Sequence, residues 1–184
     1  MRSSTRKLQN PLKLKLPNNG HGAASVAAHC STKIPNMSLI SSLLPLSNVV
    51  IDLDASSKQH VFDEAGKLFE AHQKLSRETV VASLAAREKL GSTGLGQGIA
   101  IPHGRIKGLR QAVGAFFRLK TAIPFDTPDS KPVSLLFVLL VPEQATDLHL
   151  QILGELAQMF SDRSFRERLT GMQDAAQLHQ LITG

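Results

Sequence analysis

The stretch GSTGLGQGIAIPHGR, Gly91–Arg105, places four glycines in its first eight residues, followed by a short apolar run and a histidine between Pro102 and Gly104. Glycine loses more conformational freedom on folding than any other residue, so this density of glycines costs free energy. Three interpretations account for it. The stretch is a loop that binds a nucleotide, a structural turn from a helix into an edge strand, or a loop that opens space around His103.

The nucleotide interpretation fails on sequence context. A Walker loop ends in Gly-Lys-Ser/Thr and continues into a helix, whereas Ile99 follows the last glycine of the run here. A dinucleotide-binding fingerprint needs a strand before its glycines and a helix after them. The pattern predicted here is the reverse, with a helix, then the glycines, then a strand. The structural turn and the loop around His103 both stay open.

Helical and strand patterns alternate on both sides of the glycine run. Helical spacing of apolar residues is present over 38–44, 56–74, 76–91, 146–160, 161–169 and 174–183. Strand patterns cover 48–54, 99–102, 111–120 and 133–142. The last of these, VSLLFVLLVP, is a continuous apolar run typical of a strand buried on both faces. Helices and strands interleave, so we expect an α/β protein with a single mixed β-sheet of four to five strands flanked by helices.

The net charge of +6 belongs to the first 37 residues, which carry six basic residues and no acidic one. Residues 38–184 hold 15 basic and 15 acidic residues, and the chain has neither Trp nor Tyr. A neutral domain lacks the basic footprint of a protein that binds nucleic acid. No apolar run approaches the roughly 20 residues of a membrane span. We therefore expect neither nucleic-acid binding nor membrane insertion.

Residues 1–37 are basic and rich in Ser, Asn, Pro and Gly, and they contain the single cysteine, Cys30. Such a segment buries too little apolar surface to order itself. We expect residues 1–37 to be a disordered tail or leader, or the product of a mis-assigned upstream start. Residues 38–184 are expected to form the functional domain, whose lack of cysteine fits a reducing compartment.

His103 is the residue in this stretch with the most useful chemistry. Pro102 restricts the backbone before it, and Gly104 leaves one side of it without a side chain, which suits a histidine that meets a phosphoryl group or another protein. Histidine has a pKa of about 6.5, so at cellular pH much of it is neutral imidazole, which is a nucleophile. Three other histidines, His60, His72 and His179, lie on predicted helix faces without motif support, and we expect them to be solvated.

The residues from Glu88 to Gly104 follow the pattern E-x6-L-G-x2-I-A-I-P-H-G. This pattern resembles the phosphorylation-site signature of the fructose/mannitol-type enzyme IIA proteins of the bacterial phosphoenolpyruvate:sugar phosphotransferase system. The longer run REKLGSTGLGQGIAIPHGR is most similar to the nitrogen-regulatory, PtsN-type branch of that family. The resemblance extends from about Leu39 to Ile182 and leaves the first 37 residues outside it.

The resemblance implies a role for each of five site residues. His103 accepts the phosphoryl group on its Nε2 atom, and the second family histidine falls on His149. Arg87 matches the family arginine ahead of the loop, and Arg105 and Gly104 are secondary candidates for contact with the phosphoryl group. A guanidinium fork suits phosphate oxygens, and a histidine in the first turn of a helix lies where free backbone N–H groups favour an anion. No third ligand with suitable spacing accompanies the two histidines, so no metal is expected.

The resemblance also implies what the protein does. It implies a cytoplasmic regulatory phosphocarrier that needs no cofactor, is no independent turnover enzyme, and receives phosphate from a phosphorylated HPr-like protein charged by an enzyme I-like protein. Its phosphorylation state would control partners such as potassium-transport and sensor-kinase proteins. The alternative is a sugar-specific enzyme IIA that passes phosphate to an enzyme IIB. A pure interaction module with an unused histidine is a third hypothesis, and it predicts no phosphorylation.

Overall fold

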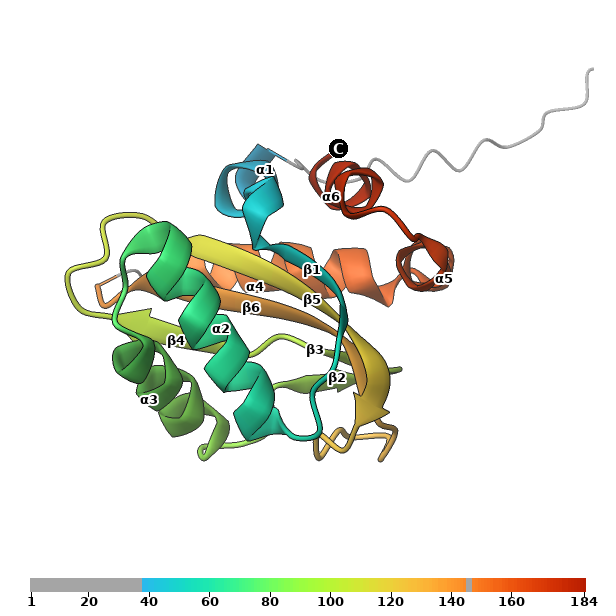
Figure 1. Ribbon diagram of the computed structural model, residues 1–184, viewed down its shortest axis with the longest axis horizontal. Coiled ribbons are helices and arrows are strands. Elements are labelled where there is room, and N and C mark those ends of the chain that lie inside the picture. Colours follow the sequence, from blue (N-terminus) through green and yellow to red (C-terminus); the bar gives the residue numbers. More distant parts are fainter. Residues whose placement is uncertain (1–37, 145–146) are drawn as a thin grey trace, which may run out of the picture. The chain divides into compact units, whose positions relative to one another are not determined.

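The computed structural model describes residues 38–144 and 147–184 (Figure 1). The expectation of a disordered tail or mis-assigned start concerns residues 1–37, which lie outside the described residues. The described helices are α1 (Ser38–Leu43), α2 (Lys58–Gln73), α3 (Arg77–Glu88), α4 (Asp147–Ser161), α5 (Arg163–Gly171) and α6 (Ala175–Thr183), with a short 3-10 helix, η1, at Leu46–Asn48. Within these residues no helix combines the length and the apolar character needed to cross a membrane.

The sheet is built around β6 (Val133–Pro142), nearly all of whose side chains are buried. On one side β6 pairs antiparallel with β5 (Val113–Ile123). On its other side it pairs parallel with two short strands in succession, β3 (Ile99–Ala100) and β4 (His103–Ile106). The continuous apolar run of β6 is therefore explained by its central place, because helices cover both faces of the sheet.

Two further strands complete the sheet. β1 (Val49–Leu53) pairs parallel with β5 at one edge, and β2 (Gly94–Gly96) pairs antiparallel with β3 at the other. The expected single mixed sheet in an α/β fold is confirmed, but across the described residues it has six strands, not four to five. The additional strands are β2 and β4. The sequence did not predict them because, with their glycines and His103, neither segment alternates apolar and polar residues or forms an apolar run.

The two faces of the sheet carry separate cores. Helices α2 and α3 pack on one face through buried residues such as Phe69 and Leu84. Helices α1, α4, α5 and α6 pack on the other, through buried residues such as Ile40, Leu156 and Leu178. Figure 1 shows α2 and α3 in front of the sheet and α4 behind it. The three layers place the carboxyl end of α3 and the amino-terminal part of α4 on opposite sides of the strand that carries His103.

The glycine run forms a β-hairpin rather than an open loop. Gln97 and Gly98 connect β2 to β3 with φ angles of 54° and 82°. A two-residue hairpin turn in which both φ angles are positive strongly favours glycine. The structural interpretation of the glycines is thus confirmed, because they turn the chain after α3 into the edge strand of the sheet.

Local signals at the helix ends agree with the sequence. Ser57 and Ser76 accept a hydrogen bond at the amino-terminal ends of α2 and α3, which satisfies free backbone N–H groups there.

The expectation that His179 is solvated is wrong. His179 is half-buried, and its Nε2 lies 2.7 Å from the carbonyl oxygen of Leu44, so it joins α6 to the end of α1.

Candidate functional site

His103 lies just after a break between β3 and β4, the two short strands that pair in succession with the same side of β6. β3 ends at Ala100, and β4 begins at His103, so Ile101 and Pro102 bridge the break. Proline has no N–H to give to a ladder, which suits it to such a gap. The break turns the backbone enough for the Nδ1 of His103 to lie 2.9 Å from the carbonyl oxygen of Ile101, two residues earlier.

The hydrogen bonds of His103 determine its tautomer. The Nε of Arg87 donates to the Nε2 of His103 over 2.9 Å. A guanidinium group has donors and no acceptor, so Nε2 must present its lone pair. The proton of the neutral ring is then on Nδ1, where the carbonyl of Ile101 accepts it. The nitrogen with the free electron pair is therefore the one that faces Arg87.

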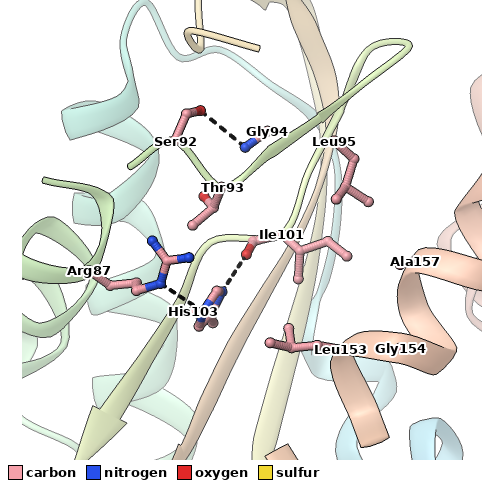
Figure 2. A pocket seen from close by; sticks show the side chains of 10 residues that line it. All are labelled: Arg87, Ser92, Thr93, Gly94, Leu95, Ile101, His103, Leu153, Gly154 and Ala157. Atoms are coloured by element: carbon pink, nitrogen blue, oxygen red, sulfur yellow. Dashed lines mark hydrogen bonds between the residues drawn. The ribbon is translucent and has the colours of Figure 1, made fainter. Parts of the chain in front are cut away.

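Arg87 reaches the site from the last turn of α3. Besides its bond to His103, its Nη1 donates to the carbonyl oxygen of Gly91 over 2.9 Å. The two bonds hold the guanidinium between the start of the glycine run and the imidazole. Figure 2 shows the bond from Arg87 to His103. The structure thus brings together two of the five residues that the sequence analysis placed at the site, His103 and Arg87.

His149 meets His103 from the opposite side. It lies in the first turn of α4, and the two ring centroids are 5.1 Å apart, with the planes at 66°. The His149 side chain is buried, and among residues 38–144 and 147–184 its Nε2 has no hydrogen-bond partner. A buried polar atom without a partner costs free energy, and it leaves a free hydrogen-bonding site next to His103.

Arg105 and Gly104 belong to the site in different ways. The side chain of Arg105 is exposed, and its Nη1 donates to the carbonyl of Glu143 over 2.7 Å. Gly104 lines a hollow together with His103, but the place that its own Cβ would occupy is already filled by α3. A Cβ at position 104 would lie 2.4 Å from the Oγ of Ser83. Glycine at this position allows α3 to pack closely on β4, which brings Arg87 within reach of His103.

Two hollows meet at His103. One, of about 320 Å³, lies between the glycine hairpin and α4 and is lined by residues that include Thr93, Leu95, Ile101 and Leu153 (Figure 2). The other, of about 440 Å³, lies between α3, β4 and α4 and is lined by His149, Arg105 and Ser83 among others. Arg87 lines both hollows, so movement of its side chain would open the imidazole to either.

Burial lowers the pKa of His103, and the positive charges of Arg87 and Arg105 lower it further, whereas the hydrogen bond to the carbonyl of Ile101 and the negative charge of Glu88 act against this. Burial also lowers the pKa of His149, and the neighbouring His103, Arg105 and Arg87 contribute in the same direction. Both rings are therefore neutral at neutral pH. This state keeps the lone pair of His103 available, and the charged residues that line the two hollows, Arg87 and Arg105, are positive.

Ser83 is a site residue that the sequence reasoning missed. It lines the second hollow, and its Oγ donates to the carbonyl of Arg105 over 2.9 Å. The signal that could have indicated it is its spacing, because Ser83 precedes Arg87 by four residues and so shares its helix face. Among the described residues, no three or more His, Cys, Asp or Glu side chains group so as to hold a metal ion.

The chain matches known proteins over nearly all of its described length. Residues 42–184 match the family model described as the phosphoenolpyruvate-dependent sugar phosphotransferase system, EIIA 2. A nitrogen regulatory protein of Pseudomonas aeruginosa is 40% identical over 134 residues, which cover 72% of this chain and 87% of that protein. A nitrogen regulatory protein of Escherichia coli is 41% identical over 128 residues, which cover 69% and 78%.

Solved structures show the same relationship. The nitrogen regulatory protein IIA-Ntr of Neisseria meningitidis is 52% identical, with a TM-score of 0.76, and the match covers 79% of this chain and 99% of that one. The IIA mannitol protein of Escherichia coli shares the fold at 23% identity, with a TM-score of 0.65 over 75% of this chain and 97% of that one. The chain therefore belongs to the enzyme IIA family of the phosphoenolpyruvate-dependent sugar phosphotransferase system, and within it to the nitrogen-regulatory members.

Proposed function

We propose that this protein is a regulatory phosphocarrier whose Nε2 atom of His103 accepts a phosphoryl group from a phosphorylated HPr-like protein in the cytoplasm. The observation that carries the proposal is the pair of bonds on the His103 ring. They leave the proton on Nδ1 and the electron pair on Nε2. The family resemblance adds the proposed targets, such as potassium-transport and sensor-kinase proteins, that respond to its phosphorylation state.

The transfer step balances without a separate acid or base. The Nε2 lone pair attacks phosphorus, the bond from phosphorus to the donor atom that carried it breaks, and that electron pair stays on the donor. The His103 ring gains positive charge and keeps its Nδ1 proton, and the carbonyl of Ile101 stabilises that charge by accepting the N–H. Arg87 must first leave Nε2, and its guanidinium then suits the oxygens of the arriving phosphoryl group.

His149 completes the proposed phosphoryl site. Its Nε2, which has no hydrogen-bond partner among residues 38–144 and 147–184, carries a proton, donates a hydrogen bond to a phosphoryl oxygen on His103 and so satisfies a buried polar atom. Arg105 adds positive charge at the rim of the same hollow. Contacts to the phosphoryl oxygens that are stronger in the transition state than in the ground state lower the barrier to transfer, and His149 and Arg105 are placed to make such contacts.

Apolar residues around the site favour a protein partner. Leu90, two residues after α3, is 85% exposed, and Leu148 and Leu150, on either side of His149, are 44% and 69% exposed. Leu95 on the edge strand is also exposed and lines the first hollow. Exposed leucines gathered at one site are typical of a protein-contacting surface rather than of a sugar-binding pocket.

A phosphotransfer assay tests the proposal. The full chain is mixed with phosphorylated nitrogen-type and sugar-type HPr-like carriers in parallel, and phosphorylation is read by intact mass. We expect one phosphoryl group from the nitrogen-type carrier, none on His103→Ala, and full uptake by the control His72→Ala, whose histidine is exposed on α2. Uptake by His103→Ala would refute the acceptor assignment, and preference for the sugar-type carrier would support the sugar-specific alternative.

A further inference from the structure

The carboxylate of Glu88, the last residue of α3, is almost fully enclosed although it lines neither hollow at His103. Its side chain is 10% exposed. One oxygen, Oε2, accepts hydrogen bonds from the backbone N–H and the hydroxyl of Thr93, over 2.9 and 2.6 Å. The other, Oε1, accepts from the Nζ of Lys58 over 2.8 Å. Glu88 therefore joins α3 to the start of the glycine hairpin.

A chain of hydrogen bonds leads from Thr93 to the imidazole. The carbonyl oxygen of Thr93 accepts from the N–H of Ile101 over 3.0 Å. The carbonyl of Ile101 in turn accepts the Nδ1 proton of His103. The position of this carbonyl, which determines the tautomer and the orientation of the ring, depends on the turn that Glu88 holds.

A second path leads from the same turn to the other ring nitrogen. The N–H of Gly91 donates to the carbonyl oxygen of Glu88 over 3.1 Å. The carbonyl of Gly91 accepts from the Nη1 of Arg87, whose Nε contacts the Nε2 of His103. The neighbouring side chains of Arg87 and Glu88 therefore form hydrogen bonds to the same turn, Arg87 at Gly91 and Glu88 at Thr93.

Lys58 holds the carboxylate in this position. It begins α2, pairs with Asp126 over 2.7 Å as well as with Glu88, and lies 4.6 Å from the centre of the Phe125 ring. A nearly enclosed carboxylate without a cation would be strongly disfavoured. Lys58 therefore connects α2 and the segment after β5 to the turn beside the site.

We propose that Glu88 is a positioning residue for phosphoryl transfer, acting through Thr93 and the turn after α3 on both hydrogen-bond partners of the His103 ring. The inference rests on the proposed function, because it concerns the rate of that transfer. Glu88 contacts neither hollow, so it acts on the orientation of the imidazole and not on binding of the donor. Small errors in the geometry of reacting atoms are costly, which gives such a residue a large effect on rate.

Single-turnover transfer from the phosphorylated nitrogen-type carrier tests this role. We expect Glu88→Ala to lower the rate at saturating donor about tenfold, with the donor concentration at half-maximal rate unchanged. Glu88→Gln keeps an acceptor for Thr93, so we expect a rate within about threefold of the unaltered protein. Thr93→Val removes one of the two donors, and we expect a fall of about fivefold.

A matched control separates positioning from stability. Asp63 accepts from the Nε of Arg77 over 2.8 Å and so links α2 to the opposite end of α3. Asp63→Asn removes a comparable helix-to-helix ion pair away from the site. We expect it to lower the melting temperature and leave the transfer rate unchanged.

A spectroscopic measurement tests the inference without any phosphoryl transfer. In the unphosphorylated protein, the ring ¹⁵N resonances of His103 should show only the tautomer with its proton on Nδ1. We expect a mixture of the Nδ1–H and Nε2–H tautomers in Glu88→Ala, and only the Nδ1–H tautomer in Asp63→Asn. Equal rates for Glu88→Ala and Asp63→Asn, a Glu88→Gln rate as low as that of Glu88→Ala, or unchanged resonances would overturn the proposal. Failure of the unaltered protein to take up phosphate would instead refute the proposed function.

Discussion

At the scale of single residues, His103 is governed by the two groups that contact its ring. The carbonyl of Ile101 can only accept and the guanidinium of Arg87 can only donate, so together they select one neutral tautomer. Protonation of Nε2 would place a positive ring against the positive guanidinium. The site therefore opposes the form of histidine that has no nucleophilic nitrogen.

The pH dependence of His103 follows from this arrangement. Burial and the charge of Arg87 lower the pKa of His103 below its ordinary value of about 6.5, so the ring stays neutral as pH falls through that value and becomes protonated only at lower pH. Arg87→Ala removes a charge that lowers the pKa, and the midpoint should move up toward 6.5. Titration of the ring ¹⁵N resonances measures the pKa of His103 in the unaltered protein and in Arg87→Ala. A lower pKa in Arg87→Ala would contradict the role given to the arginine's charge.

At the scale of elements, the site depends on how closely α3 approaches β4. Gly104 is buried on β4, and Ser83 of α3 lies against it, with its hydroxyl bonded to the carbonyl of Arg105. The contact positions the carboxyl end of α3, where Arg87 is carried. A larger residue at 104 would separate helix and strand, and Arg87 would move away from His103.

We expect Gly104→Ala to lower the free energy of unfolding by about 1–3 kcal/mol, because the new methyl group would lie 2.4 Å from the Oγ of Ser83. Part of this loss should disappear in the double variant with Ser83→Ala, which removes the nearest atom. Urea unfolding of the four proteins in this double-mutant cycle measures the coupling. Strictly additive losses would show that the two residues do not interact.

At the scale of the whole described domain, a buried arginine joins the carboxyl-terminal helices to the sheet. Arg118 of β5 is 4% exposed. Its Nη1 donates to the carbonyl oxygens of Leu169, Thr170 and Met172 at the end of α5, and its Nη2 donates to Asp52 of β1 over 2.9 Å. One side chain therefore satisfies the free carbonyls of a helix end and ties that helix to two strands.

We expect Arg118→Met to lower the free energy of unfolding by about 2–4 kcal/mol, because the helix-end carbonyls lose their donor. The control Arg163→Met removes an exposed pair with Glu167 on the same helix and should leave the stability almost unchanged. Denaturant unfolding of both variants gives the comparison. If Arg118→Met were as stable as the control, the arginine would not hold the helix.

The sequence by itself determined the α/β class, the approximate extent of most helices, the buried strand β6 and the candidate His103, whereas Arg87 and His149 were indicated only by the family resemblance. These are local features. Apolar periodicity, capping serines and a contiguous motif are encoded within a few residues of one another, and they can be recognised before the chain folds. The match to known relatives extends the same local pattern along residues 42–184.

Only the tertiary structure decided the remaining features. Four features depend on contact partners that no periodic pattern in the sequence indicates. They are strands β2 and β4, the close packing at Gly104, the contact between His179 and Leu44, and the link from Glu88 to the imidazole. The tautomer of His103 belongs to this group as well, since Arg87 lies 16 residues away along the chain. Such contacts exist only once the sheet brings distant segments together, because hydrogen bonding and steric fit depend on position in space and not on position in sequence.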